Sequence, residues 1–507
     1  MRKSGILMPI FSLPSPYGIG SFGKAAYNFV DFLSKSGQSY WQILPIGPTG
    51  FGDSPYQSFS SFAGNPYFID LDILVNESLL QKSEIEEYDF GDNTAKIDYE
   101  KLYTNRYPLL QKAFERFKRD DSYETFIKEN DYWLNDYALF MAIKSSCGGD
   151  AWYTWSKELI SKDLDAICKA HHDYIDDVNF HKFLQFEFYK QWNSLKQYAN
   201  ENNIKIIGDI PIYVALDSAD VWANPKQFQL NDDYVPKAVA GVPPDAFSED
   251  GQLWGNPLYD WNYMKQTGYT WWKGYLGHAL KCYDVVRIDH FRGFEAYFSI
   301  PYGDENAKKG KWVKGPNTDL FKAFKQEFGS DLPIIAEDLG IITPAVHKLL
   351  KFTNFPGMKV LQFAFSGDSE NSYLPHNIIK NCVVYTGTHD NDTIMGWLKS
   401  SDADTVNQAN DYLNYQNDIG FNWAMIKAAM SSVADTCIIP MADFMGLGSE
   451  GRINTPSTLG ENWTWRIDGG CINDWLANII KENTKLYGRY MPSPWGEGVE
   501  RSDTDEG

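Results

Sequence analysis

The segment DVVRIDHFRG (residues 284–293) joins a short apolar run to a cluster of charged side chains. Val285 and Val286 are typical of a strand that is buried on both faces, as in a parallel sheet. Alternate side chains of a strand share a face, so Val285, Arg287 and Asp289 are expected to point the same way. In a barrel, functional side chains gather at the carboxyl ends of the strands, where Arg287 can pair with Asp289. The segment therefore predicts a buried strand that ends at a pocket.

Six other segments repeat this order of an apolar run, polar residues, and then Gly or Pro. They are residues 39–48, 204–214, 332–340, 357–365, 381–391 and 436–448. Helical patterns lie between several of them, for example at 318–329 and 344–352. Alternating strands and helices predict βαβ units with a parallel sheet. Seven predicted strands, with an eighth not yet assigned, favour an α/β fold of the (β/α)8 TIM-barrel type over an open sheet.

The order of strands and helices is interrupted between residues 76 and 200. This stretch is rich in Tyr, Phe, Lys, Glu and Asp at helical spacing, which predicts a helical insertion subdomain between barrel strands. The catalytic barrel is then expected to comprise residues 1–75 and 201–490. Residues 491–507 are rich in Pro, Gly and acidic side chains, which is typical of a disordered tail.

The charge balance narrows the possible partners. The chain has 46 Lys and Arg against 67 Asp and Glu, a net charge of −21. A surface of this sign repels nucleic acid and anionic membranes, whereas a neutral substrate is not repelled. Aromatic residues make up 16% of the chain, so a ligand with flat apolar faces, such as a sugar, deserves consideration.

The sequence indicates a cytoplasmic protein. No apolar stretch reaches 18 residues, and the short apolar run after Arg2 and Lys3 is broken by prolines, unlike a secretory signal. The six cysteines lack the CxxC spacing of a metal site and are expected to be buried free thiols.

Carboxylates recur at the ends of the predicted strands. Asp289, Glu337 and Asp390 occupy equivalent positions after three of them, and Asp209 is similarly placed. One interpretation is glycoside chemistry, which needs one ionised and one protonated carboxyl group beside the scissile bond. A divalent metal site is a second, although Arg287 next to the acids disfavours a cation. A structural role as helix caps or ion-pair partners is the third, and it becomes less convincing as the matching positions accumulate.

The motifs RIDHFRG, IIAEDLG and TGTHDN together resemble the amylomaltase, or 4-α-glucanotransferase, family of the α-amylase clan. The similarity extends along nearly the whole chain, through residues 47–71, 208–222, 241–257, 356–365 and 446–456. It implies transfer of a 1,4-α-glucan segment to the 4-OH of another glucan or glucose, by a retaining double displacement through a covalent glycosyl-enzyme. The implied substrates are maltooligosaccharides and other 1,4-α-glucans, with no cofactor and no metal.

The resemblance also implies a role for each motif residue. Asp289 would be the nucleophile and Glu337 the acid/base, while Asp390 would stabilise the distorted sugar. Arg287 would hold Asp289 ionised, and His389 would hydrogen-bond the sugar. The remaining positions are implied to bind substrate: Tyr56, Ser54, Asp209, Gln252, Trp254, Asp245 and Asn462.

Alternatives stay open at this stage. Tyr56 suits a loop anchor as well as a stacking surface, and Trp254 suits a surface turn as well as a lid over the substrate. A retaining α-glucan hydrolase could use the same acids, and a glucan-binding protein without activity could have inherited them.

Overall fold

The computed structural model describes residues 2–50, 52–244, 248–340, 342–416 and 419–490. Eight parallel strands form one sheet in the order β10-β11-β12-β1-β2-β3-β6-β9. The sheet nearly closes on itself, because the Ala336 N–H at the end of β9 donates to the Pro356 carbonyl just before β10 (2.9 Å). The predicted (β/α)8 barrel is therefore confirmed.

The eight strands are short and alternate with helices along the chain. They are β1 (Lys3–Leu7), β2 (Tyr40–Gln42), β3 (Lys205–Ile210), β6 (Val285–Ile288), β9 (Ile334–Ala336), β10 (Gly357–Val360), β11 (Cys382–Tyr385) and β12 (Thr436–Pro440). Each of the seven predicted segments contains one of them. The eighth strand is β1, which pairs with β2 on one side and β12 on the other.

Gly5 explains why β1 was not predicted. The strand reads KSGIL, in which Ile6 is the one β-branched residue and Gly5 occupies the centre. A Cβ atom at Gly5 would lie 2.5 Å from the Tyr40 carbonyl oxygen and 2.8 Å from Ile438 Cδ1. Glycine is therefore required where three strands pack closely, and it weakens the sequence pattern of a strand there.

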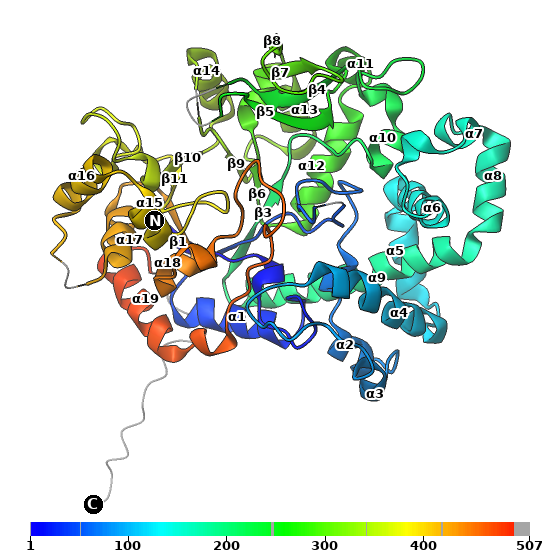
Figure 1. Cartoon of the computed structure of the whole chain (residues 1–507), viewed down its shortest axis with the longest axis horizontal. Helices are drawn as coiled ribbons and strands as arrows, with labels where there is room; N and C mark the ends of the chain where they lie inside the picture. Colours follow the sequence, from blue (N-terminus) through cyan, green and yellow to red (C-terminus); the bar gives the residue numbers. More distant parts are fainter. Residues whose placement is uncertain (1, 51, 245–247, 341, 417–418, 491–507) are drawn as a thin grey trace, which may run out of the picture.

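Helices surround the barrel (Figure 1). Those that alternate with its strands include α1 (Lys24–Lys35), α12 (Thr270–Cys282), α13 (Thr318–Phe328), α14 (Pro344–Thr353), α15 (Ile394–Ser400), α16 (Ala403–Leu413), α17 (Phe421–Ser431), α18 (Met441–Met445) and α19 (Asp474–Leu486). In α1 the buried side chains Ala26, Phe29, Val30 and Leu33 follow helical spacing, so one face covers the barrel.

Between β2 and β3 the residues that the structure describes form helices and contribute no strand to either sheet. They are α2 (Leu71–Asn76), α3 (Lys82–Ile85), α4 (Tyr99–Arg116), α5 (Asp121–Glu129), α6 (Asp131–Ser146), α7 (Lys157–Ile160), α8 (Leu164–Asp173) and α9 (Ile175–Glu201). The long helix α9 packs on α6 and also on α1 and β3, so it joins these helices to the barrel. The division of the chain into a barrel and a separate insertion subdomain remains a prediction.

A second sheet of four antiparallel strands lies at the top of Figure 1, and the sequence did not predict it. It consists of β4 (Ala238–Val242), β5 (Gln252–Pro257), β7 (Ala296–Pro301) and β8 (Lys311–Lys314). The segment 241–257, which contains Trp254 and for which both a surface turn and a lid were considered, supplies the end of β4 and all of β5. The short helices α10 (Ala219–Ala223) and α11 (Trp261–Gln266) lie before β4 and after β5 in the chain.

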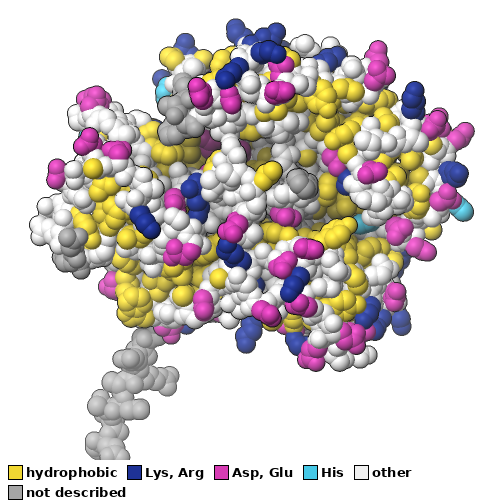
Figure 2. Space-filling model, in the orientation of Figure 1, with side chains coloured by type: hydrophobic (Ala, Val, Ile, Leu, Met, Phe, Trp, Pro, Cys, Tyr) yellow, Lys and Arg dark blue, Asp and Glu magenta, His cyan; other side chains and the backbone are white. Residues whose placement is uncertain are grey.

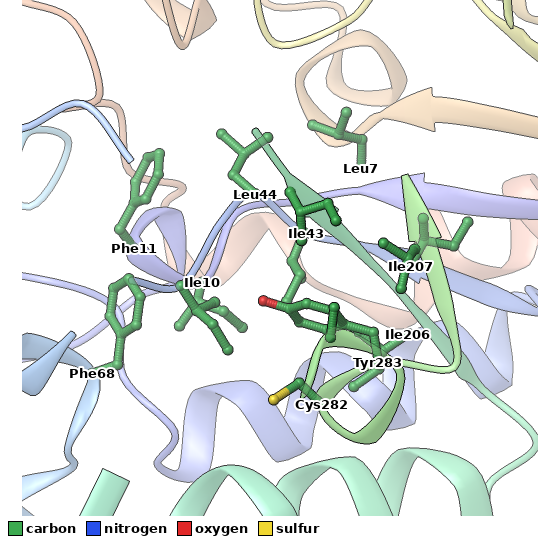
Figure 3. Packing of buried hydrophobic residues seen from close by; sticks show 14 of the residues in the cluster. Leu7, Ile10, Phe11, Ile43, Leu44, Phe68, Ile206, Ile207, Cys282 and Tyr283 are labelled. Carbon is green, nitrogen blue, oxygen red and sulfur yellow. The ribbon is translucent and has the colours of Figure 1, made fainter. Parts of the chain in front are cut away.

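The core is apolar and closely packed, as the cluster in Figure 3 illustrates. Tyr283 lies beside Ile206 and Ile43 there, next to Cys282 at the end of α12. A Cβ atom at Gly208 would lie 2.2 Å from the Tyr283 ring, so glycine lets this ring pack directly on β3.

The structure also shows the state of the cysteines and the distribution of charge on the surface. All six cysteines are free thiols, but Cys168 is exposed, so the expectation that all of them are buried was wrong. Asp and Glu side chains are spread around the face seen in Figure 2. Within the described residues, no helix combines the length and the apolar composition needed to cross a membrane. The expected tail, residues 491–507, lies outside the described residues.

Candidate active site

Arg287 lies at the centre of the charged cluster at the carboxyl end of β6. Its Nη2 is 3.0 Å from Asp289 Oδ1, and its Nη1 is 2.5 Å from Asp209 Oδ2 on the neighbouring strand β3. Asp209 and Arg287 are register partners in the two strands. Burial alone would lower the pKa of the Arg287 guanidinium, but the charges of Asp209 and Asp289 raise it well above its ordinary value. The buried strand tolerates these charges because they compensate one another.

The two carboxylates that share Arg287 differ in exposure. The Asp209 side chain is fully buried, whereas that of Asp289 is 30% exposed at the mouth of the barrel. The next residue, His290, has a left-handed backbone with φ of 49°, which turns the chain sharply after Asp289. Asp289 is therefore the member of the cluster that a ligand in the mouth can reach.

Glu337 follows the apolar strand β9 and is 9% exposed. Its carboxylate accepts hydrogen bonds from the backbone N–H groups of His290 (2.7 Å) and Leu339 (2.6 Å). Burial and the nearby charge of Asp289 nevertheless raise the pKa of Glu337 to about 7. The His290 N–H bond also ties Glu337 to the residue that follows Asp289, so the two acids are held together.

Asp390 follows β11, and the loop after α18 holds it in place. Asn454 Nδ2 donates to Asp390 Oδ1 (2.6 Å), and Arg452 Nη2 donates to the Asp390 carbonyl (3.0 Å). His389, almost fully buried, places its Nε2 3.4 Å from the same Oδ1. Arg452 and Asn454 were not predicted as site residues, although both lie in the segment 446–456, which contributes to the family resemblance.

Tyr56 links three parts of this site. Its hydroxyl donates to Asp209 Oδ2 (2.9 Å), and its ring stacks on His389 with centroids 5.1 Å apart at 15°. The Ser54 hydroxyl accepts from the Tyr56 N–H (3.3 Å), so Ser54 shapes the turn that presents the ring. Tyr56 thus anchors its loop beside Asp209 and His389, and its stacking on a sugar stays a prediction.

Trp254 and Gln252 lie on β5 and contact each other, because Trp254 Nε1 donates to Gln252 Oε1 (3.0 Å). The Trp254 ring meets His290 edge to face at 4.9 Å, which brings the small sheet next to Asp289. Asn462 is used within its own loop, where its side chain binds the Thr455 N–H (2.9 Å) and the Thr458 carbonyl (2.9 Å). Asp245 lies outside the described residues.

A parallel (β/α)8 barrel with this arrangement defines a class of enzyme. An aspartate paired with arginine, and a glutamate with a raised pKa near it at the mouth of such a barrel, are the types of carboxyl group that glycoside chemistry uses. Comparison with known proteins narrows the class. The chain belongs to the 4-alpha-glucanotransferase family, whose model matches residues 8–472. It is thus an enzyme that acts by transglycosylation.

Individual relatives are similar to this chain over nearly its full length. The chain is 53% identical to the 4-alpha-glucanotransferase of Clostridium butyricum, over 95% of this chain and 100% of that protein. It is 45% identical to the 4-alpha-glucanotransferase of Thermus thermophilus, over 92% and 95% of the two chains. The structure of amylomaltase from Streptococcus agalactiae in complex with acarbose superposes with a TM-score of 0.94 at 40% identity, covering 97% of this chain and all of that one.

Proposed function

We propose that the enzyme transfers a segment of a 1,4-α-glucan to the 4-OH of another glucan or glucose, through a covalent intermediate on Asp289. The observation that carries this proposal is the pairing of unlike carboxyl groups at the barrel mouth. Arg287 holds Asp289 as an oriented anion, while burial beside β9 raises the pKa of Glu337 to about 7. One group is thus suited to nucleophilic attack and the other to proton transfer near neutral pH.

In the first step, an Asp289 carboxylate oxygen attacks the anomeric carbon of the donor glucan. The bond from this carbon to the glycosidic oxygen breaks, and Glu337 gives its proton to that oxygen. The shortened glucan leaves with a free 4-OH, and the other segment is bound to Asp289 as an ester. The configuration at the anomeric carbon is inverted once.

In the second step, Glu337 acts as a base. It takes the proton from the 4-OH of an acceptor glucan, whose oxygen attacks the anomeric carbon and displaces Asp289. The second inversion restores the α configuration, and Glu337 is protonated again for the next cycle.

The remaining side chains position the sugar. We assign Asp390 to the hydroxyls of the distorted ring, because it is 45% exposed at the mouth while Asn454 fixes one of its oxygens. His389 and Tyr56 form a stacked pair beside Asp390, and Arg287 orients the nucleophile. Trp254 and Gln252 border the mouth from β5, where they suit the acceptor side and the exclusion of water.

The substrates and the compartment are proposed on separate grounds. Maltooligosaccharides and 1,4-α-glucans are uncharged, so the net charge of −21 does not repel them, whereas it disfavours nucleic acid and anionic membranes. Free thiols at all six cysteines suit the reducing cytoplasm, where we place the enzyme.

The test is incubation with maltotriose and no added cofactor, with chain lengths read by chromatography. We expect a ladder of longer maltooligosaccharides from the unaltered enzyme and none from Asp289→Ala. Glucose and maltose alone would make the chain a hydrolase. A ladder that survives in Asp289→Ala would remove Asp289 from the nucleophile's role.

A further inference from the structure

A cavity of about 270 Å³ lies outside the barrel mouth, between α6 of the helical region and the short helix α10 with the start of α12. Helices α6 and α10 pack against each other at this place (Figure 1). None of Asp289, Glu337 and Asp390 lines the cavity. One wall is formed by Ser60 and Phe62, which belong to the same loop as Tyr56.

Tyr132 presents an exposed aromatic ring to this cavity in a fixed position. Its side chain is 52% exposed, yet its hydroxyl lies 3.0 Å from His278 Nδ1, and His278 Nε2 lies 2.8 Å from the Tyr189 hydroxyl. The Tyr189 hydroxyl donates to the Phe62 carbonyl, so its oxygen accepts from His278 Nε2–H. Nδ1 of the neutral ring must then accept from Tyr132. This chain of hydrogen bonds holds the ring in place before a ligand arrives.

The neutral state of His278 agrees with its surroundings. Burial lowers the pKa of His278 to about 4, so the ring carries a single proton at neutral pH. Phe62 also meets the Tyr132 ring edge to face, with centroids 5.7 Å apart at 90°. A rigid, half-exposed aromatic ring is a suitable surface for the apolar face of a sugar, because little side-chain freedom is lost on binding.

The polar groups around the cavity favour a neutral ligand with hydroxyl groups. Trp271 is 8% exposed and its Nε1 has no hydrogen-bond partner among the described residues, nor has Gln227 Oε1. One is a donor and the other an acceptor, and a hydroxyl group can serve either. Asn224 and Thr270 add further polar side chains to the lining.

The charged groups exclude other ligand classes. The lining contains no Lys or Arg, so it does not suit an anion. Of its two acids, Asp136 is paired with Lys162 at 3.1 Å, and Asp220 accepts the Ser61 N–H at 2.7 Å. Asp136 is thus already paired with a cation, and burial raises the pKa of Asp220 to about 7, which reduces its charge at neutral pH. A cation also could not accept a hydrogen bond from Trp271.

We propose that this cavity is a second binding site for an α-1,4-glucan chain, separate from the barrel mouth. Tyr132 stacks on a glucose ring, and the partly exposed Gln227 side chain binds one of its hydroxyls after a small turn brings Oε1, shielded from solvent in this conformation, into the cavity. The choice of glucan among neutral sugars rests on the proposed function. A polymer bound here lies against the loop that carries Tyr56, which keeps its chain ends close to the barrel mouth.

The test compares binding of a polymer with transfer on a short substrate. Tyr132→Ala and Gln227→Ala are run on native gels containing amylopectin, and maltotriose transfer is measured on the same samples. We expect the dissociation constant for amylopectin to rise about fivefold or more, with kcat/KM for maltotriose within about twofold of the unaltered value. Tyr153→Ala is the matched control, because Tyr153 is 43% exposed and does not line the cavity.

Tyr132→Phe separates stacking from support of the fold, since it keeps the ring and removes only the bond to His278. We expect it to bind amylopectin more tightly than Tyr132→Ala. If amylopectin in the gel slowed Tyr132→Ala and Gln227→Ala as much as it slows the unaltered enzyme, the proposal would be overturned. A crystal structure with maltoheptaose that shows only water in the cavity would also overturn it. The proposal would also be overturned if Tyr132→Ala and Tyr132→Phe lost amylopectin binding and maltotriose transfer to the same extent. Absence of maltotriose transfer in the unaltered enzyme would instead contradict the proposed function.

Discussion

At the scale of single residues, Asp289 and Glu337 have the same chemical group in opposite surroundings. Asp289 is partly exposed and paired with Arg287, while Glu337 is enclosed by the end of an apolar strand. Burial is the largest cause of the raised pKa of Glu337, and the charge of Asp289 adds to it. The pKa of Glu337 therefore depends in part on the negative charge of Asp289 beside it.

The pH dependence of the donor step follows from this pair. The first step needs protonated Glu337, which exists below its pKa of about 7 and is lost above it. We therefore expect kcat/KM for maltotriose to fall on the alkaline side with an apparent pKa near 7. Initial rates from pH 5 to 9 in constant ionic strength would measure it. A rate that stays level from pH 6 to pH 8.5 would contradict the assignment of Glu337 as the acid.

Asp209 is a positioning residue in this arrangement, since its buried side chain reaches Arg287 and Tyr56 but not the mouth. In Asp209→Asn the guanidinium loses one of its two anions and Asp289 loses its fixed orientation. We expect kcat for maltotriose transfer to fall about 100-fold, with KM changed much less. Circular dichroism would show whether the barrel is intact. A folded variant with normal kcat would show that Asp289 is oriented without Asp209.

At the scale of elements, the segment 452–454 acts as a clamp on the end of β11. Arg452 binds the Asp390 carbonyl, Asn454 binds its carboxylate, and the Asn454 N–H donates to the His389 carbonyl (3.1 Å). The loop after one strand thus orients the acid at the end of another. Such a contact spans 64 positions in the chain between Asp390 and Asn454.

Substitutions of Asn454 in this clamp should lower the rate of glucan transfer, by an amount that depends on the new side chain. We expect kcat/KM to fall about 10- to 100-fold in Asn454→Ala, because a hydrogen bond to a charged group contributes about 1.5–3 kcal/mol. Asn454→Asp should fall further, since it places a second negative charge beside Asp390. Transfer from maltotriose by both variants measures the effect. Equal activity of Asn454→Asp and the unaltered enzyme would show that Asp390 does not depend on this contact.

The elements also show what the sequence could and could not predict. Seven barrel strands, and the acids at the ends of four of them, were predictable, because apolar runs and the charges that end them are local patterns. Strand β1 was not, since Gly5 serves close packing against β2 and β12 rather than strand propensity. The pairing of β4 with β7 and the Asn454 contact were also missed, because both join segments far apart in the sequence. Asp209 was placed correctly at a strand end, but its complete burial behind Arg287 could not be foreseen.

At the scale of the whole molecule, stability depends on how closely the barrel strands meet. Gly5→Ala would bring a Cβ atom within 2.5 Å of the Tyr40 backbone, which cannot move without disturbing β2. We expect the free energy of unfolding to fall by about 1–3 kcal/mol or more. Denaturant titration followed by tryptophan fluorescence would measure it.

Gly274→Ala is the matched control for this prediction. A Cβ atom at Gly274, inside α12, meets nothing within 4 Å. We expect this variant to be unchanged or more stable by about 0.5–1 kcal/mol, because alanine favours a helix interior over glycine. If both variants lost the same stability, the close approach at Gly5 would not be the cause.

The position of β1 between β2 and β12 has a consequence for how the protein is made. Lys3 is the register partner of Thr436, so the first strand cannot complete its pairing until almost the entire chain has been synthesised. At roughly 5–20 residues per second, ribosomes need on the order of 20 s to more than a minute to cover this separation. During that time one edge of β1 has no strand beside it, which exposes it to wrong pairing in a nascent chain. Final closure of the barrel therefore comes late in the synthesis of the chain.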